Sequence, residues 1–346
     1  MQRLFSKFKR RYIILTTVTL FFALFWSEWG SYWWMQGKGQ LNVLWNAEPM
    51  EEWVLKPHVT EKQRSKALLI EKIKQFAIDS LGISPSESYN KVFDQEGKPI
   101  LWTLTACDPY ALEPYKWTYP LIGEAGYRGY FNKERGQKDL QKMKEEGFDV
   151  SLDPVSAWST LGWFDDPILS KMLDYSEGEL ARLIIHEMTH GTVFIESDAV
   201  FNENLATFIG DSGAYLFLIH QYGNGSEPHT YYSNRMQDLR LYKEHMHHFA
   251  LELKDHYEIH QDAEQELKQH LKDSMITQFK KDLSQLSFRQ PDRFKRIWAD
   301  SNEINNTYFT GYLMYNNQQD SIRDLFLKEY GGDFEAWLQA LKEEND

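Results

Sequence analysis

A histidine pair with a glutamate beside its first member is the part of this sequence with the clearest chemical meaning. Residues 184–190 read Ile-Ile-His-Glu-Met-Thr-His, so His186 and His190 are four positions apart and Glu187 directly follows His186. On a helix, positions i and i+4 lie on the same face. Two imidazoles so placed can bind one zinc ion, and the adjacent carboxylate can reach a water on that ion. The pattern predicts a zinc-dependent hydrolase, most directly a peptidase.

The surrounding residues indicate the helix that this chemistry needs. Ser176 is followed three residues later by Glu179, the pattern of a capping box at a helix N-terminus. Apolar residues then recur at helical spacing between Leu180 and Met188. Gly191, directly after the second histidine, is placed to end or bend the helix.

A catalytic zinc ion takes three protein ligands and leaves its fourth position for water. Residues 199–208 also read as a helix, separated from the first by a short turn at 196–198. If the two helices are antiparallel, Glu203, thirteen residues after His190, lies under the histidine pair. We therefore predict Glu203 as the third ligand. The weaker alternatives are nearby carboxylates: Glu196, Asp198 and Asp211. Asn202 and Thr207 are candidates to donate or accept a hydrogen bond that orients one of these zinc-binding side chains.

Several further stretches resemble a bacterial family of predicted zinc aminopeptidases within the broader gluzincin-like group. They are 32–41, 112–114 with Trp117, 127–131, 159–167, the pair Asn202-Glu203 and the pair Asn305-Asn306. The resemblance covers roughly residues 32–315 and implies His186, His190 and Glu203 as zinc ligands, with Glu187 as the catalytic base. It departs at Thr118 and Glu124, where members of that family often carry cysteines, so no disulfide is expected there.

Composition narrows the class of protein. The 346 residues can bury a substantial core, and an aromatic content of 15% is not that of a disordered chain. The first eleven residues carry five positive charges and no acid, so the rest has a net charge of about −18, which is −13 less 5. This acidic body argues against a nucleic-acid partner. The single cysteine, Cys107, allows no intrachain disulfide and is expected to be a small buried apolar residue.

The N-terminus predicts a membrane anchor over residues 1–30. An uncharged, largely apolar run at 12–26 follows the basic start, and it ends in aromatic residues instead of the small residues of a signal-peptidase site. We expect a single-pass anchor in a bacterial cell membrane with the body on the exported side, periplasmic or extracellular. The alternative is secretion after signal cleavage. The aromatic residues expected at the outer membrane surface are Trp26, Trp29, Tyr32, Trp33 and Trp34.

The remaining pattern predicts a helix-rich α+β, zincin-like metallopeptidase domain over residues 31–346. A small α+β lobe is expected over about 60–165, and a helical lobe with the zinc site over about 166–346. A sheet edge of the first lobe would hold an extended peptide by strand addition. The predicted helices are 61–81, 136–146, an antiparallel pair within 232–286 and a last helix at 321–343; the predicted strands lie at 98–105, 126–131 and 148–152.

The function expected from these features is hydrolysis of peptide bonds by a zinc-activated water, as an aminopeptidase acting on peptide or protein substrates. The alternatives are a membrane-anchored zinc endopeptidase and a non-catalytic module stabilised by zinc. For a second histidine pair, His256 and His260, no adjacent acid completes a metal-binding constellation, and the pair is expected to be solvated. The candidate oxyanion donors are Tyr127, Arg128, Tyr308 and Tyr312, and the candidates to bind a substrate amine are Glu124, Asp165 and Asp166.

Overall fold

The computed structural model describes residues 28–119, 123–155, 165–196, 198–299, 304–313 and 318–345. Residues 1–27 of the predicted anchor, which was expected over 1–30, lie outside these ranges, as does most of the 159–167 stretch. Within them, no helix combines the length and the apolar character needed to cross a bilayer.

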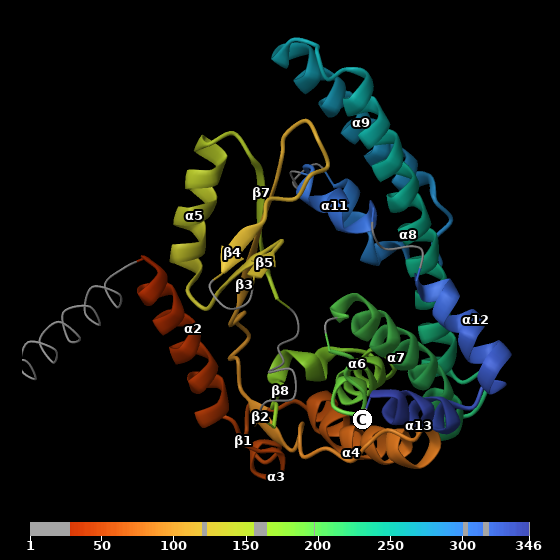
Figure 1. The fold of residues 1–346 in the computed structure, drawn as a ribbon. Coiled ribbons are helices and arrows are strands. Elements are labelled where there is room, and N and C mark those ends of the chain that lie inside the picture. Colours follow the sequence, from red (N-terminus) through yellow and green to blue (C-terminus); the bar gives the residue numbers. More distant parts are fainter. Residues whose placement is uncertain are drawn as a thin grey trace, which may run out of the picture.

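The fold is helix-rich α+β with three small sheets, as predicted (Figure 1). The helices are α2 Glu28–Trp45, α3 Met50–Trp53, α4 Glu61–Leu81, α5 Lys133–Glu145, α6 Glu177–His190, α7 Ala199–Tyr222, α8 Glu227–Ile259, α9 Gln265–Gln285, α10 Lys295–Trp298, α11 Thr307–Leu313, α12 Gln318–Tyr330 and α13 Phe334–Asn345, with 3-10 turns η1 Ser170–Asp174 and η2 Pro291–Arg293. The strands are β1 Glu48–Pro49, β2 Lys91–Phe93, β3 Trp102–Cys107, β4 Trp117–Tyr119, β5 Gly123–Ala125, β6 Arg128–Tyr130, β7 Asp149–Pro154 and β8 Ile168–Leu169.

The main sheet has the order β6-β3-β7 and is antiparallel throughout. Its central strand pairs Leu104 with Arg128 on one side and with Leu152 on the other. A second sheet, β1-β2-β8, joins β2 to β8 in parallel, and β4 pairs with β5 as a separate antiparallel pair. Strand β8 of this short second sheet leads the chain directly into η1 and α6, so it sets where the helix with the histidine pair begins.

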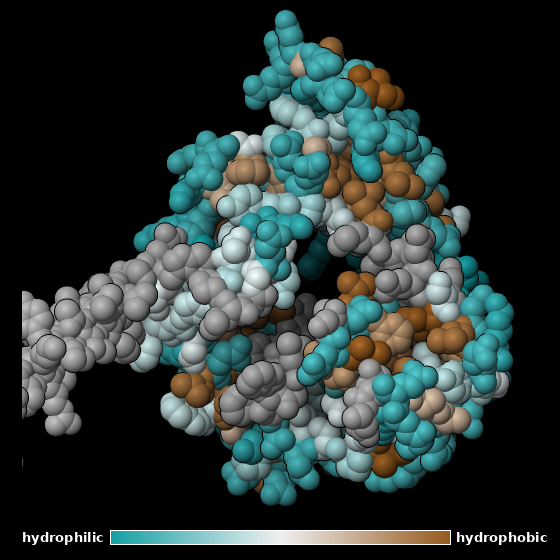
Figure 2. All heavy atoms as spheres, in the orientation of Figure 1, coloured by the Kyte–Doolittle hydropathy of each residue, from teal (hydrophilic) through white to brown (hydrophobic). Residues whose placement is uncertain are grey.

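The buried apolar residues form three separate clusters. The largest surrounds α4, α6, α7 and α13; the second joins α8, α9 and α11; the third lies under the main sheet and includes Tyr32 of α2. Helix α8 contributes Tyr232 to the first cluster and Phe249 to the second. It therefore connects the helices around the first cluster, which we call the base, to the arm that it forms with α9 and α11 (Figure 1). Figure 2 shows a hollow in this face between the part that contains the sheet and the helices of the base.

The local signals predicted the helices well, and the exceptions have physical causes. Helix α4 has the predicted bounds, because a Thr60–Gln63 capping box starts it and left-handed Gly82 ends it. The long pair α8 and α9 is also confirmed. The single helix predicted at 321–343 is wrong: Gly331 and Gly332 adopt φ of 59° and 89°, and they divide it into α12 and α13.

Candidate active site

Helix α6 carries the histidine pair and forms as its sequence predicts. The Ser176 hydroxyl accepts a hydrogen bond from the amide of Glu179 at 3.3 Å, and the Glu179 carboxylate accepts one from the amide of Ser176 at 3.2 Å. The helix ends at His190, with Gly191 as its C-cap. Its apolar face, which includes Ile184 and Met188, is buried in the largest cluster. This burial fixes the helix, and therefore the direction of both histidines.

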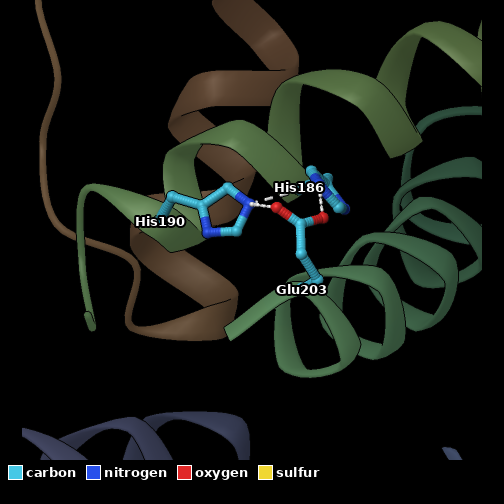
Figure 3. Close-up of side chains that lie close together, drawn as sticks. All are labelled: His186, His190 and Glu203. Atoms are coloured by element: carbon cyan, nitrogen blue, oxygen red, sulfur yellow. Dashed lines mark hydrogen bonds and ion pairs between the residues drawn. The ribbon is translucent and has the colours of Figure 1, made fainter. Parts of the chain in front are cut away.

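The carboxylate of Glu203 on α7 lies against the two imidazoles (Figure 3). The Nε2 atoms of His186 and His190 are 3.3 Å apart. The Glu203 carboxylate lies 3.4 Å from Nε2 of His190 through Oε1, and 3.7 Å from Nε2 of His186 through Oε2. The histidine side chains are 14% and 9% exposed, while that of Glu203 is 61% exposed. The group is thus closed on its histidine side and open to solvent on its carboxylate side.

These separations can be compared with those that zinc requires. Ligand atoms about 2.0–2.1 Å from a tetrahedral zinc ion are about 3.4 Å from one another. The three observed separations, 3.3, 3.4 and 3.7 Å, are close to that value. Among the described residues, this is the one group of three or more histidine, cysteine or acidic side chains placed to hold a metal ion. The residues present therefore fit a zinc ion with one coordination position left over.

The electrostatics favour neutral imidazole at His186. Burial lowers the pKa of His186 to about 4, and the neighbouring charges of His190 and Arg182 act in the same direction. A hydrogen bond with His190 is the main cause that lowers the pKa of Glu203. At neutral pH His186 therefore has a free lone pair and Glu203 is ionised, which are the forms that bind a metal.

The close approach of α7 to α6 depends on a glycine. A β-carbon added to Gly210 would lie 3.0 Å from the carbonyl oxygen of Arg182 and 3.1 Å from Cβ of His186. Even an alanine at this position would therefore require α6 and α7 to shift by a few tenths of an ångström relative to each other. No local sequence pattern indicates this requirement, because it depends on which helices pack together.

We expect Gly210→Ala to weaken zinc binding by about 10-fold, the lower end for changes that displace a ligand indirectly. The added methyl group moves Glu203 relative to His186, although alanine itself favours a helix. Competition with a chromophoric chelator measures the affinity. Gly37→Ala is the control, since Gly37 lies in helix α2 and nothing is within 4 Å of its added β-carbon. Unchanged affinity in Gly210→Ala would show that the helix spacing does not set the site.

The N-terminus of α6 is held by a second group of charges. The Glu179 carboxylate accepts a hydrogen bond from Nε of Arg235 at 2.8 Å and one from Nη2 of Arg293 at 2.7 Å. Burial opposes ionisation of Glu179, but the two arginines and the Ser176 hydrogen bonds outweigh it and lower its pKa. The carboxylate therefore contributes stability above its unfolded pKa of about 4.3, and this contribution is lost as the pH falls through the lower folded pKa.

Glu179→Gln is expected to lower the free energy of unfolding by about 1.5–3 kcal/mol at pH 7, the range for hydrogen bonds to charged groups. The difference from the parent should shrink in acid, once Glu179 is protonated in both states. Urea midpoints at pH 7 and in acid measure this. Glu244→Gln, which breaks an exposed pair with Arg240, should cost about 0.3–0.5 kcal/mol. A loss for Glu179→Gln that is equal at both pH values would contradict the assignment.

The alternative carboxylates have other roles. Asp211 forms an ion pair with Arg182, and Asp198 caps α7 by accepting from the amide of Phe201 at 2.9 Å. Glu196 does not join the metal-binding group among the described residues. Asn202 is buried and bonds the amide and carbonyl of Ile195 at 2.9 and 2.8 Å, so it fixes the connecting loop and not a histidine. For Thr207, the structure shows no hydrogen bond to either histidine within its described part.

The candidate oxyanion donors lie mostly in packing positions. The Arg128 guanidinium covers the ring of Tyr32 at 4.4 Å, and the hydroxyls of Tyr308 and Tyr242 are 2.5 Å apart. Tyr312 packs edge-on against Tyr242, while Tyr127 is exposed. Among the candidate amine-binding acids, Glu124 lies 3.4 Å from Lys116, Asp165 is exposed and Asp166 is buried. These positions agree with structural roles for most of the set.

Tyr89, which precedes β2, is a residue that the sequence did not indicate. It is 3% exposed and adopts a left-handed φ of 70°, a strained conformation for a residue other than glycine. Its amide donates to the carbonyl oxygen of Asp166 at 2.7 Å. Burial raises the pKa of Tyr89, and the negative charges of Glu187 and Asp166 raise it further. Tyr89 is therefore within electrostatic reach of the predicted base, brought there by a loop distant in sequence.

Fold and site together define a helix-rich α+β protein with a candidate metal centre shared by two helices. The chain belongs to the family described as "Putative aminopeptidase", which matches residues 31–346. This membership supports a peptidase, and hence a hydrolase, function and extends the resemblance seen in the sequence to residue 346. Comparison with curated proteins and with solved structures finds no match.

Proposed function

We propose that this protein is a zinc-dependent aminopeptidase whose zinc ligands are His186, His190 and Glu203. The proximity of these three side chains carries the proposal, because one ligand atom from each lies within 4.8 Å of the others, close enough to share one zinc ion. Family membership supports the peptidase part. A zincin-like fold and location on the exported side of a bacterial membrane remain part of the proposal.

The chemistry that zinc supplies when bound is a water of lowered pKa and a polarised carbonyl. Glu187 follows His186 on α6 and is half-buried. Its carboxylate accepts the proton of the attacking water and delivers it to the amine that leaves. The buried side chain of Tyr89 is one group that interacts electrostatically with this carboxylate. The open side of Glu203 gives the peptide its approach.

A purely structural zinc site is a poorer account of these residues. Structural sites usually close with four protein ligands, whereas the described residues offer a group of three. A glutamate beside the first histidine also has no role in a site without catalysis. Endopeptidase action uses the same ligands and base, so it differs only in how the substrate is held.

The test combines metal analysis with cleavage of paired substrates. Purified full-length protein should contain one zinc per chain, lose hydrolysis with a chelator and regain it when zinc is returned. A peptide with a free N-terminus should be cleaved at its first bond, and its N-acetylated counterpart should not. Equal cleavage of both peptides would replace the aminopeptidase by an endopeptidase. Zinc without cleavage of either peptide would support the structural alternative, and no zinc would overturn the proposal.

A further inference from the structure

Helix α2 is attached firmly to the rest of the molecule by one of its faces. The Gln36 amide donates to the carbonyl oxygen of Gly129 at 2.6 Å, and Val43 is 1% exposed. Gly39 lies so close to Phe131 that an added β-carbon would be 2.1 Å from the ring. Because this inner face is fixed to the sheet, the orientation of the opposite face is fixed as well.

The opposite face carries an exposed stripe of residues suited to a membrane surface. Trp34 is 61%, Leu41 42% and Trp45 78% exposed, and spacings of seven and eleven residues place them on one side of the helix. Lys38 is exposed between them and is the only charged residue from position 30 to 45. We call these four residues the tryptophan stripe. Tryptophan and lysine in this arrangement are typical of helices that lie in a membrane interface.

A cavity of about 590 Å³ opens beside the tryptophan stripe. Its walls combine aromatic and apolar side chains with two cations, and no acidic residue of the described chain lines it. The members that matter here are Trp34, Lys38, Ile100, Trp102, Phe131 and Arg135. In a protein of net charge −13, a basic cavity with apolar walls is complementary to an anionic amphiphile and not to the average surface of another copy.

The chain that precedes α2 identifies the partner. Five basic residues within the first eleven are followed by the uncharged apolar run 12–26, which ends two positions before α2 begins. Figure 1 shows α2 at the edge of the molecule away from α8 and α9. A bilayer that takes up the apolar run therefore lies within reach of the tryptophan stripe.

We propose that the tryptophan stripe lies flat on an anionic phospholipid surface, with a headgroup between Lys38 and Arg135. Basic residues near such a surface are attracted by its negative charge. In this arrangement α2 runs parallel to the membrane and holds the sheet, and through it the catalytic helices, at one orientation. The proposal is independent of the peptidase activity, since no stripe residue belongs to the candidate active site.

A fluorescent probe at single cysteines tests the geometry. The native Cys107 is fully buried and burial raises the pKa of its thiol to about 12, so introduced cysteines can be labelled selectively. Trp34→Cys and Trp45→Cys are labelled with an environment-sensitive probe in the full chain. Ile259→Cys is the matched control, since Ile259 is 75% exposed at the end of α8. The labelled proteins are reconstituted in vesicles of phosphatidylcholine with or without phosphatidylglycerol, with bromine on the acyl chains as the quencher.

The brominated acyl chains should quench the probes at positions 34 and 45 to the same extent. This quenching should be stronger in vesicles that contain phosphatidylglycerol, and the probe at position 259 should not be quenched. The two positions are about 16 Å apart along the helix axis, so a helix normal to the membrane would leave the probe at 45 unquenched and overturn the proposal. A probe that is shielded from water but not quenched by lipid would indicate a second protein copy instead.

Lys38→Glu combined with Arg135→Glu should abolish the dependence of quenching on phosphatidylglycerol. A retained dependence, or failure of the chain to associate with vesicles, would also overturn the proposal.

Discussion

Glu187→Gln is expected to reduce the rate of peptide hydrolysis by about 10²–10⁴-fold, the usual contribution of a general base. Glutamine keeps the size of the side chain and its place on α6, but it cannot take a proton from water. The zinc content should not change, because the proposed ligands are on either side of this residue and on α7. The measurement is kcat on a peptide with a free N-terminus, together with zinc per chain on the same sample.

Glu177→Gln is the matched control for this substitution. Glu177 lies in the first turn of the same helix and pairs with Lys66 at 2.6 Å, so it has a structural partner and no part in the metal group. Its glutamine variant should retain hydrolysis. Activity equal to the parent in Glu187→Gln would remove this residue from the role of base, whereas loss of zinc would mean that Glu187 supports the ligands.

His186→Ala and Glu203→Ala are expected to lower the affinity for zinc by more than about 100-fold, beyond the effect of residues that only support a ligand. Each removes one of three proposed ligands, and neither side chain belongs to an apolar cluster. Elemental analysis after dialysis gives zinc per chain. Hydrolysis should disappear in parallel with the metal.

The second histidine pair provides the control for these variants. His256 and His260 have ring centroids 4.3 Å apart, and Nδ1 of His260 lies 2.9 Å from the carbonyl oxygen of His256. His256→Ala should keep the full zinc content, because no acid completes a site there among the described residues. Full zinc in Glu203→Ala would instead move the third ligand to another carboxylate, with Glu196 the first to examine because Asp198 and Asp211 have other partners.

The features of the fold that could be predicted from the sequence are those that short-range interactions along the chain determine. The ends of α6 were predicted from capping residues that act within one helical turn, and α4 was predicted from the helical spacing of its apolar residues. The break at Gly331 and Gly332 was missed because helical periodicity continues across it and the left-handed backbone does not appear in that pattern. The strand predicted at 98–105 begins only at Trp102 and continues to Cys107, since its length is set by pairing with β7.

The candidate site shows the same division. The histidines are close because they share one helix, and the position of Glu203 required only a short connection between two helices. Tyr89 and Gly210 could not be predicted in this way. Tyr89 interacts electrostatically with Glu187 from the loop between α4 and β2, and Gly210 matters only because α7 packs directly on α6. Both are consequences of the assembled fold and not of any local pattern.

The division of the apolar interior into three clusters has a consequence for hydrogen exchange. Units with separate cores open with separate free energies, so backbone amides should fall into groups of different protection. Helix α8 enters two of these clusters, through Tyr232 near its start and Phe249 further along. Amides at its two ends should therefore exchange at different rates within one continuous helix. Unfolding would then proceed in stages, with the arm of α9 and α11 able to open while α6 and α7, which carry the histidine pair and Glu203, stay closed.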